Sequence, residues 1–280
     1  MAIAKDDQRV LRALSAARAE HEELAELLDF YFDLYEVQFR AKAEIPEPEV
    51  RDDLAMSWRV EGGIPQLTFD QLRIEPEAFS ELVTQVKKVL FRHNPGWQQE
   101  REVPGPNELV DLAQRVFETW DTLTSPKPAP AETGDEELQA DHATALAVGF
   151  ALAPYLQRAS ELIMSDLDLT MWSQSHCPLC GGRPNFTILS EESGARELMC
   201  SRCASLWSYP RIGCPFCETE ERPIFYPSED GLHRLYVCGS CNRYLKGVDL
   251  RKARRVVHPR VERLLTVGMD LAAHQEGYEG

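Results

Sequence analysis

In the first 172 residues the hydrophobic side chains recur every three or four positions, which is the spacing of one buried helix face. The clearest stripe consists of Leu24, Leu27, Leu28, Tyr31, Leu34 and Tyr35. Further helices are predicted to begin near Pro76 and Pro106, because a proline at the first helical position leaves no N–H unpaired. A fourth helix is predicted over about 136–167, with Pro154 expected to kink or split it. We interpret these stripes as a helical core rather than as a cofactor site.

The segments between these stripes have different patterns. Residues 59–72 form no regular repeat and are predicted to be an irregular connection with a turn at Gly62-Gly63. Residues 124–134 are rich in proline and small side chains, which predicts an exposed loop. Beyond residue 172 the apolar runs become short, and strands are predicted at 185–189 and 223–226. Helical spacing returns from Pro259, which predicts a last helix.

Charge divides the chain at the same place as the hydrophobic pattern. The 280 residues carry a formal net charge of −16. Residues 1–172 contain 33 acidic and 16 basic side chains, whereas residues 173–280 are nearly neutral. All eight cysteines also lie in the second part. The chain is therefore predicted to join an acidic, cysteine-free helical domain to a cysteine-rich region.

The composition excludes two classes of protein. The longest apolar run, 145–153, is nine residues long, about half of what a membrane span needs. The first residues lack the apolar core of a secretory signal. We therefore expect no membrane insertion and a cytoplasmic location, where thiols stay reduced.

The cysteines form four Cys-x-x-Cys pairs, and these pairs carry the most specific signal in the sequence. The eight residues are Cys177, Cys180, Cys200, Cys203, Cys214, Cys217, Cys238 and Cys241. Nineteen residues separate the first two pairs, and twenty separate the last two. Two pairs that bracket a loop of this length are typical of a four-thiolate metal site, because each tight turn directs both sulfurs to one ion. The sequence therefore predicts two mononuclear metal sites, holding iron or zinc.

The two halves of this region also repeat each other. Each opens with Cys-Pro-x-Cys and closes with a turn of small residues, which favours pairing each opening turn with the next closing one. A cross-braced pairing of alternate turns remains the alternative. Gly181 and Asn242 follow a second cysteine and tolerate the left-handed backbone of such turns. Ala204 and Glu218 tolerate it less well, so the four turns are expected not to be equivalent.

Several functions are compatible with these cysteines. The sites stabilise a small domain in any case. Binding of nucleic acid would use the basic patch at 251–255, but the net negative charge opposes it. Thiol redox catalysis requires a cysteine pair at a helix N-terminus, and the pattern here does not supply one. Rubredoxin-like electron transfer requires iron. We find no phosphate-binding loop, nucleophile elbow or metalloprotease motif in the sequence.

A resemblance to a known family narrows these alternatives. The residues that carry it are Cys-Pro-Leu-Cys-Gly at 177–181, Cys-Ser-Arg-Cys at 200–203, Cys-Pro-Phe-Cys at 214–217, Cys-Gly-Ser-Cys-Asn-Arg-Tyr-Leu-Lys at 238–246 and Gln-Glu-Gly-Tyr at 275–278. This combination resembles the formate dehydrogenase accessory proteins called FdhE, strongly over 172–278.

The resemblance implies a fold with four parts. The α+β multidomain fold is expected to consist of a helical domain (1–172), two rubredoxin-like or zinc-ribbon modules (173–211 and 212–250) and a C-terminal helical segment (251–280).

It also implies a non-catalytic maturation factor, similar to chaperones, that binds the catalytic subunit of a formate dehydrogenase in the cytoplasm. It favours iron in the metal sites. The alternatives are an electron carrier and a nucleic-acid-binding ribbon. Trp207, Arg211, Tyr244 and Lys246 are expected to form a partner surface or a contact between modules.

Overall fold

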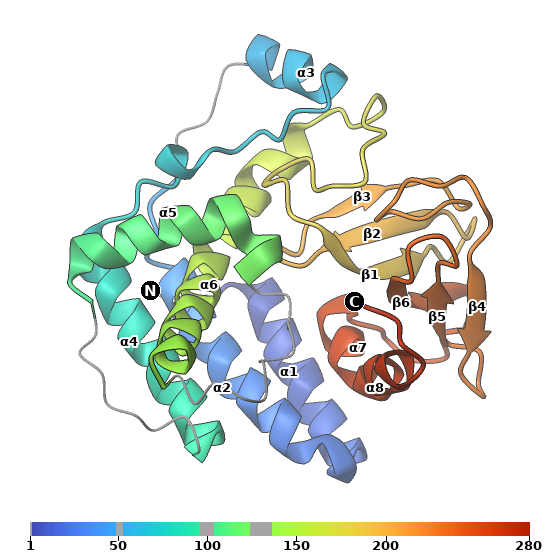
Figure 1. Cartoon of the computed structure of the whole chain (residues 1–280), viewed down its shortest axis with the longest axis horizontal. Coiled ribbons are helices and arrows are strands. Elements are labelled where there is room, and N and C mark those ends of the chain that lie inside the picture. The colour runs from blue at the N-terminus through green and yellow to red at the C-terminus, as the bar shows by residue number, and fades with distance from the viewer. Residues whose placement is uncertain (1, 49–52, 96–103, 124–135) are drawn as a thin grey trace. The chain divides into compact units, whose positions relative to one another are not determined.

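The computed structural model describes residues 2–48, 53–95, 104–123 and 136–280, which form two compact units (Figure 1). The helical unit comprises Met1–Glu49 and Thr68–Ala159. The cysteine-rich unit comprises Val50–Leu67 and Ser160–Gly280. The predicted α+β fold, with a helical N-terminal region before a sheet and C-terminal helices, is confirmed. The boundaries at residues 172, 211 and 250 stay predictions.

The helical unit is built from amphipathic helices. They are α1 (Lys5–Glu20), α2 (Ala25–Lys42), α4 (Pro76–His93), α5 (Pro106–Leu123) and most of α6 (Glu136–Ile163). Helix α4 begins at Pro76 as predicted, and the Glu75 carboxylate caps it by accepting the N–H groups of Glu77 and Ala78. Pro154 lies inside α6 without ending it. The predicted loop at 124–134 lies outside the described residues.

The segment predicted to be irregular contains short helical elements. Helix α3 (Asp53–Glu61) occupies its start, and a 3-10 helix (Phe69–Leu72) occupies its end. Between them Gly63 has a φ of +65°, which a glycine adopts without steric strain. The predicted turn at Gly62-Gly63 is therefore present, but the prediction of an irregular connection over 59–72 was wrong at both ends of that segment. Helix α3 has only nine residues, so its pattern is too short to show periodicity.

The cysteine-rich unit contains one six-stranded sheet with the order β3-β2-β1-β6-β5-β4. The strands are β1 (Pro184–Leu189), β2 (Arg196–Cys200), β3 (Leu206–Ser208), β4 (Ile224–Pro227), β5 (His233–Val237) and β6 (Tyr244–Asp249). Each half of the repeat contributes an antiparallel three-stranded sheet. The halves join through the parallel pair β1 and β6. The two modules thus share one continuous sheet.

Gly247 makes this parallel junction possible. It lies opposite Thr187, and a Cβ atom at Gly247 would collide with the carbonyl oxygen and the methyl group of Thr187. Only glycine allows the two strands to approach this closely.

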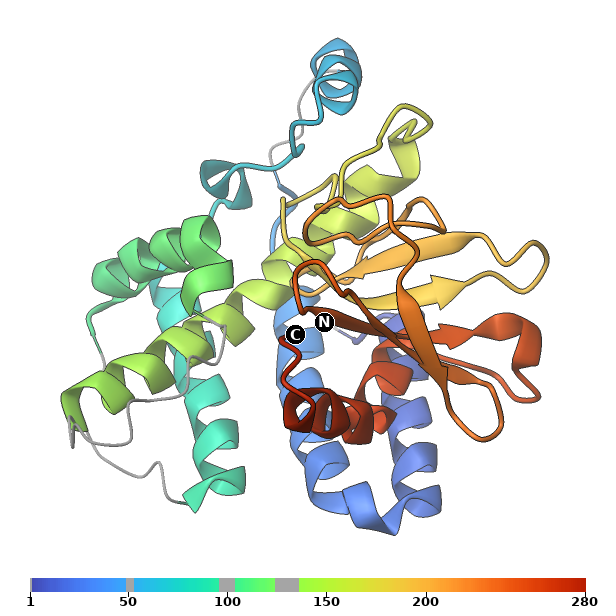
Figure 2. The ribbon, with the colours of Figure 1, turned by 45° about the vertical axis from the view of Figure 1, so that its right-hand side comes forward.

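Helices α7 (Pro259–Leu265) and α8 (Val267–Gln275) contact this sheet, and both views show them beside β6 (Figures 1 and 2). Helical spacing predicted one last helix, but the chain forms two, because Thr266 leaves helical geometry and its hydroxyl bonds the carbonyls of Glu262 and Arg263. Glu262 is fully buried and accepts hydrogen bonds from His233 at 2.8 Å and Arg255 at 2.6 Å. The bond from His233 attaches α7 to β5, and the bond from Arg255 holds the segment before α7.

The outer strand β4 has three exposed apolar side chains, Ile224, Phe225 and Tyr226. Ser228 donates its N–H to the carbonyl of His233. Because hydrogen-bonded pairs alternate along an antiparallel ladder, the backbone groups of residues 224 and 226 bond to β5. The backbone groups of Pro223, Phe225 and Pro227 therefore point away from the sheet. Two of these three positions are prolines, which have no N–H. The outer edge of β4 therefore has few backbone N–H groups with which another strand could pair.

Within the described ranges, none of the helices combines the length and apolar character needed to cross a membrane.

Candidate metal centres

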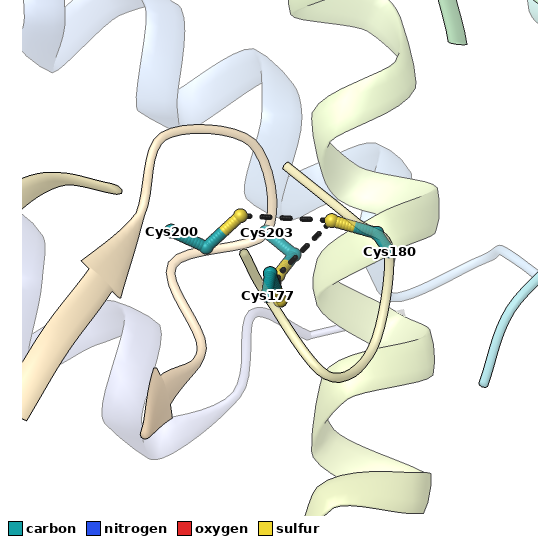
Figure 3. Close-up of side chains that lie close together, drawn as sticks. All are labelled: Cys177, Cys180, Cys200 and Cys203. Carbon is teal, nitrogen blue, oxygen red and sulfur yellow. Dashed lines mark hydrogen bonds between the residues drawn. The ribbon is translucent and has the colours of Figure 1, made fainter. Parts of the chain in front are cut away.

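The first two cysteine pairs converge at one point of the cysteine-rich unit. Cys177 and Cys180 lie in the loop before β1, whereas Cys200 ends β2 and Cys203 lies in the turn that follows (Figure 3). The Sγ–Sγ distances are 3.6 Å between Cys177 and Cys203, 3.5 Å between Cys180 and Cys200, and 3.7 Å between Cys180 and Cys203. We call this cluster site 1.

The last two pairs form an equivalent cluster, site 2. Its sulfurs lie 3.7 Å apart between Cys214 and Cys241 and also between Cys217 and Cys238. In both sites all four ligand atoms lie within 4.8 Å of one another, and all eight cysteines are free thiols. The structure therefore groups adjacent pairs, and the cross-braced alternative does not occur.

These distances fit a tetrahedral metal ion. Metal–sulfur bonds of about 2.3 Å require sulfurs about 3.8 Å apart in a regular tetrahedron. The sulfur–sulfur distances of 3.5–3.7 Å given above match that edge length. Both clusters therefore have the donor set and the geometry of a four-thiolate site for zinc or iron.

All four turns share one backbone conformation. The residue after each second cysteine has a positive φ: Gly181 (71°), Ala204 (59°), Glu218 (58°) and Asn242 (54°). Each of these residues donates its N–H to the carbonyl of the first cysteine of its turn, over 2.9–3.2 Å. The expectation that the turns differ was wrong. Convergence of the sulfurs imposes the left-handed conformation even on residues that disfavour it.

Some backbone N–H groups point at the sulfurs. Arg202 donates its N–H to Cys200 Sγ and Phe216 donates its N–H to Cys214 Sγ, both at 3.4 Å. Such bonds stabilise thiolate charge and orient the ligand. In site 1, Ser205 Oγ also lies 2.9 Å from Cys203 Sγ and 2.7 Å from Ser160 Oγ.

The thiol pKa values show that each cluster without a cation holds a limited negative charge. Burial raises the pKa of Cys177 and of Cys200, whereas hydrogen bonds from neighbouring thiols lower the pKa of Cys180. Burial raises the pKa of Cys241 to about 12. Burial also opposes ionisation of Cys238, but the N–H groups of Cys241 and Ser240 outweigh it and lower that pKa to about 7. A bound cation would therefore favour ionisation of all four thiols of a site together.

The two sites differ in burial. All four cysteines of site 1 are buried, whereas in site 2 Cys217 is exposed and Cys241 is half-buried. Residues from the N-terminal half of the sequence cover site 1, because Gln66 and Leu67 donate their N–H groups to the carbonyls of Pro178 and Leu179. Sequence reasoning missed this cover, since the segment has no pattern that links it to the cysteines.

Two buried arginines lie beside the sites. Arg202 donates to the carbonyl of Cys180 at 3.2 Å. Arg196 is 3% exposed, and its guanidinium carbon lies over the rings of Tyr209 and Tyr236, 5.7 and 5.4 Å from their centroids. Arg196 also donates to the carbonyl of Gly213 at 3.1 Å, immediately before Cys214. A side chain from the first module thus fixes the chain where the second site begins. Arg202 lies within the second cysteine motif, Cys-Ser-Arg-Cys at 200–203, but Arg196 had no such signal.

The structure separates the four residues proposed for a contact surface. Trp207 is 2% exposed, and its indole N–H bonds the carbonyl of Gln174. Tyr244 and Lys246 are buried, and both donate to the Asp270 carboxylate of α8. Arg211 is exposed, in the connection between the modules. Their role in recognition stays a prediction, and of these four residues only Arg211 offers its side chain freely to solvent.

The fold and the two clusters define a class of protein in which a helical unit accompanies a tandem four-cysteine metal-binding unit. Residues 176–211, which contain site 1, match the family model described as "FdhE, central domain". The chain is similar to a protein FdhE homolog from Aquifex aeolicus, with 24% identity over 98% of this chain and 93% of the relative. It is 31% identical to a protein FdhE homolog from Pseudomonas aeruginosa, over 46% of this chain and 47% of that relative.

A solved structure agrees with these matches. The crystal structure of the FdhE protein from Pseudomonas aeruginosa superposes with a TM-score of 0.57 over 99% of this chain and 92% of that one. At 21% identity this likeness establishes the fold. The chain is therefore similar to FdhE proteins over almost its whole length, and residues 176–211 match the central-domain model of that family.

The unequal burial predicts two rates of metal release. A chelator reaches site 2 through the exposed Cys217, whereas site 1 must first open locally. A local opening of only about 1.4 kcal/mol slows release about tenfold. Stopped-flow mixing with a coloured chelator should therefore give a fast and a slow phase of equal amplitude.

Single-ligand variants assign these phases. Cys217→Ser should remove the fast phase and Cys180→Ser the slow one. A single phase in the wild-type protein, or loss of the slow phase in C217S, would contradict the assignment.

The position of Arg196 predicts a stability loss on a substitution that keeps its charge. Arg196→Lys retains the cation but loses the planar stack and the hydrogen bonds to the connection. The free energy of unfolding of the metal-loaded protein should fall by about 1–3 kcal/mol in urea titrations. Arg211→Lys is the matched control, because Arg211 is exposed in the same connection. Equal stability of R196K and R211K would show that Arg196 does not fix the second site.

Proposed function

We propose that this protein is a metal-binding accessory factor for the maturation of a formate dehydrogenase. In this proposal it binds the catalytic subunit of the dehydrogenase in the cytoplasm and catalyses no reaction of its own. The observation that carries the proposal is the pair of four-thiolate sites in a chain that is similar to FdhE proteins over 98% of its length. The name of that family associates its members with formate dehydrogenase.

The metal sites support this proposal as structural elements. Sites 1 and 2 lie at the ends of the strand pairs that build the sheet, so metal binding and folding of the cysteine-rich unit are coupled. We propose iron or zinc as the bound ion, and iron would add one-electron chemistry while zinc would not. With either ion, the ordered sheet holds in place the surface that would bind the dehydrogenase subunit.

One observation favours a second candidate, a rubredoxin-like electron carrier. Cys217 is exposed, so a redox partner at the surface would lie close to an ion in site 2, and an electron could pass between them over a short distance. Protein purified from its native host would then show thiolate-to-iron absorption in the visible range. That absorption should bleach reversibly on reduction, and a colourless protein that contains zinc would contradict this second candidate.

Co-purification tests the main proposal. Tagged protein made in its native host should retain the catalytic subunit of a formate dehydrogenase at moderate salt, identified by mass spectrometry. Cys177→Ser with Cys180→Ser should abolish that retention and lower dehydrogenase activity in cells that lack the wild-type protein, because site 1 organises β1 and β2.

The matched control is Ser201→Ala, which changes the other metal-binding turn of site 1 without removing a ligand. Recovery of no dehydrogenase subunit by the wild-type protein, or of ribosomal and RNA-bound proteins instead, would contradict the proposal. Unchanged dehydrogenase activity in the double cysteine variant would contradict the role of site 1.

A further inference from the structure

A pocket outside the metal sites lies within the cysteine-rich unit, between α3 and the segment 166–171 that follows α6. Its volume is about 200 Å³. The residues that line it are Met56, Ser57, Val60, Glu61, Asp166, Leu167, Asp168 and Met171. Neither the cysteines nor the sheet contribute to it.

The floor and rim of this pocket are apolar. Met56 and Val60 are buried below it, whereas Met171 on its rim is 67% exposed. Trp58, on the same helix as Met56, is 64% exposed. Exposed large apolar side chains around a cavity mark interaction sites more often than isolated ones do. Methionines adapt their shape to different apolar partners.

The size of the pocket restricts what it accepts. Pockets for small molecules usually measure about 300–1,000 Å³, and this one is smaller. It therefore suits an apolar side chain that projects from a larger molecule better than it suits a complete small ligand.

The charges around the pocket indicate which residues flank that side chain in the partner. Three of the lining residues are carboxylates, Glu61, Asp166 and Asp168, and none of the described lining residues is basic. Asp168 accepts hydrogen bonds from the N–H and hydroxyl of Thr170, which lower its pKa and keep it ionised. A complementary partner carries lysine or arginine beside its apolar anchor.

We propose that this pocket, the Met56–Met171 pocket, binds a peptide segment of a partner protein in which an apolar side chain is flanked by basic residues. The apolar side chain enters between Met56 and Met171, and the basic residues face Glu61, Asp166 and Asp168. The identity of the partner as a dehydrogenase subunit rests on the proposed function, but the chemistry of the segment does not.

A fluorescently labelled ten-residue peptide that alternates lysine with leucine tests the binding. The full-length metal-loaded protein should bind this peptide at low salt and lose affinity as salt increases. The same peptide with glutamate for lysine, or with serine for leucine, should bind at least tenfold more weakly. Equal binding of all three peptides, or binding of none, would overturn the proposal.

Two variants locate the peptide. Met171→Lys should weaken its binding at least tenfold, because it places a cation on the apolar rim. Leu271→Lys is the matched control, since Leu271 is 61% exposed on α8 and lies outside the pocket. Glu61→Gln with Asp166→Asn should reduce the salt dependence of binding. Equal affinity of M171K and L271K for the peptide would overturn the assignment of the pocket.

Two further results separate this inference from its rivals. A wild-type protein that sediments as a dimer, with M171K as a monomer, would assign the pocket to a second copy of the chain and overturn the proposal. If the wild-type protein binds the peptide but retains no dehydrogenase subunit, the proposed function fails while the pocket assignment stands. If it retains the subunit but binds no peptide, the pocket assignment alone fails.

Discussion

The cysteine-rich unit depends on one electrostatic constraint, the placement of four thiol sulfurs within 4.8 Å of one another at two points of a single sheet. Thiolates at that distance repel one another, and burial adds to the energy needed to ionise them. A bound divalent cation offsets both penalties, so metal binding stabilises the folded unit. The identical left-handed turns at all four pairs follow from the same constraint, including the turns that end in Ala204 and Glu218.

The two sites arise from one repeated motif, but they have different surroundings because the two halves share one sheet. The halves join in parallel through β1 and β6, so they meet through different strands and different neighbours. Site 1 is covered by the backbone of Gln66 and Leu67. Site 2 leaves Cys217 at the surface. Tandem sites with the same ligands therefore need not share a function, since exposure controls access of chelators, reductants and partners to the metal.

The sequence was sufficient to predict the features that have a short repeat. Helical spacing located α4 from Pro76, and the Cys-x-x-Cys spacing located both four-cysteine clusters and their adjacent pairing. Contacts between residues distant in sequence were not predictable. The cover over site 1 and the hydrogen bond from Arg196 to Gly213 depend on tertiary packing, which leaves no periodic signal in the chain. Helix α3, which lines the Met56–Met171 pocket, was missed because a nine-residue helix shows too few turns.

The central claim is that each chain holds two metal ions, one in each four-cysteine cluster. Native mass spectrometry of the protein from its host, combined with elemental analysis, tests this claim most directly. The account predicts a mass increase that corresponds to two ions per chain, and loss of one ion in Cys214→Ser with Cys217→Ser. A chain without metal, or one whose cysteines are joined in disulfides, would contradict the account.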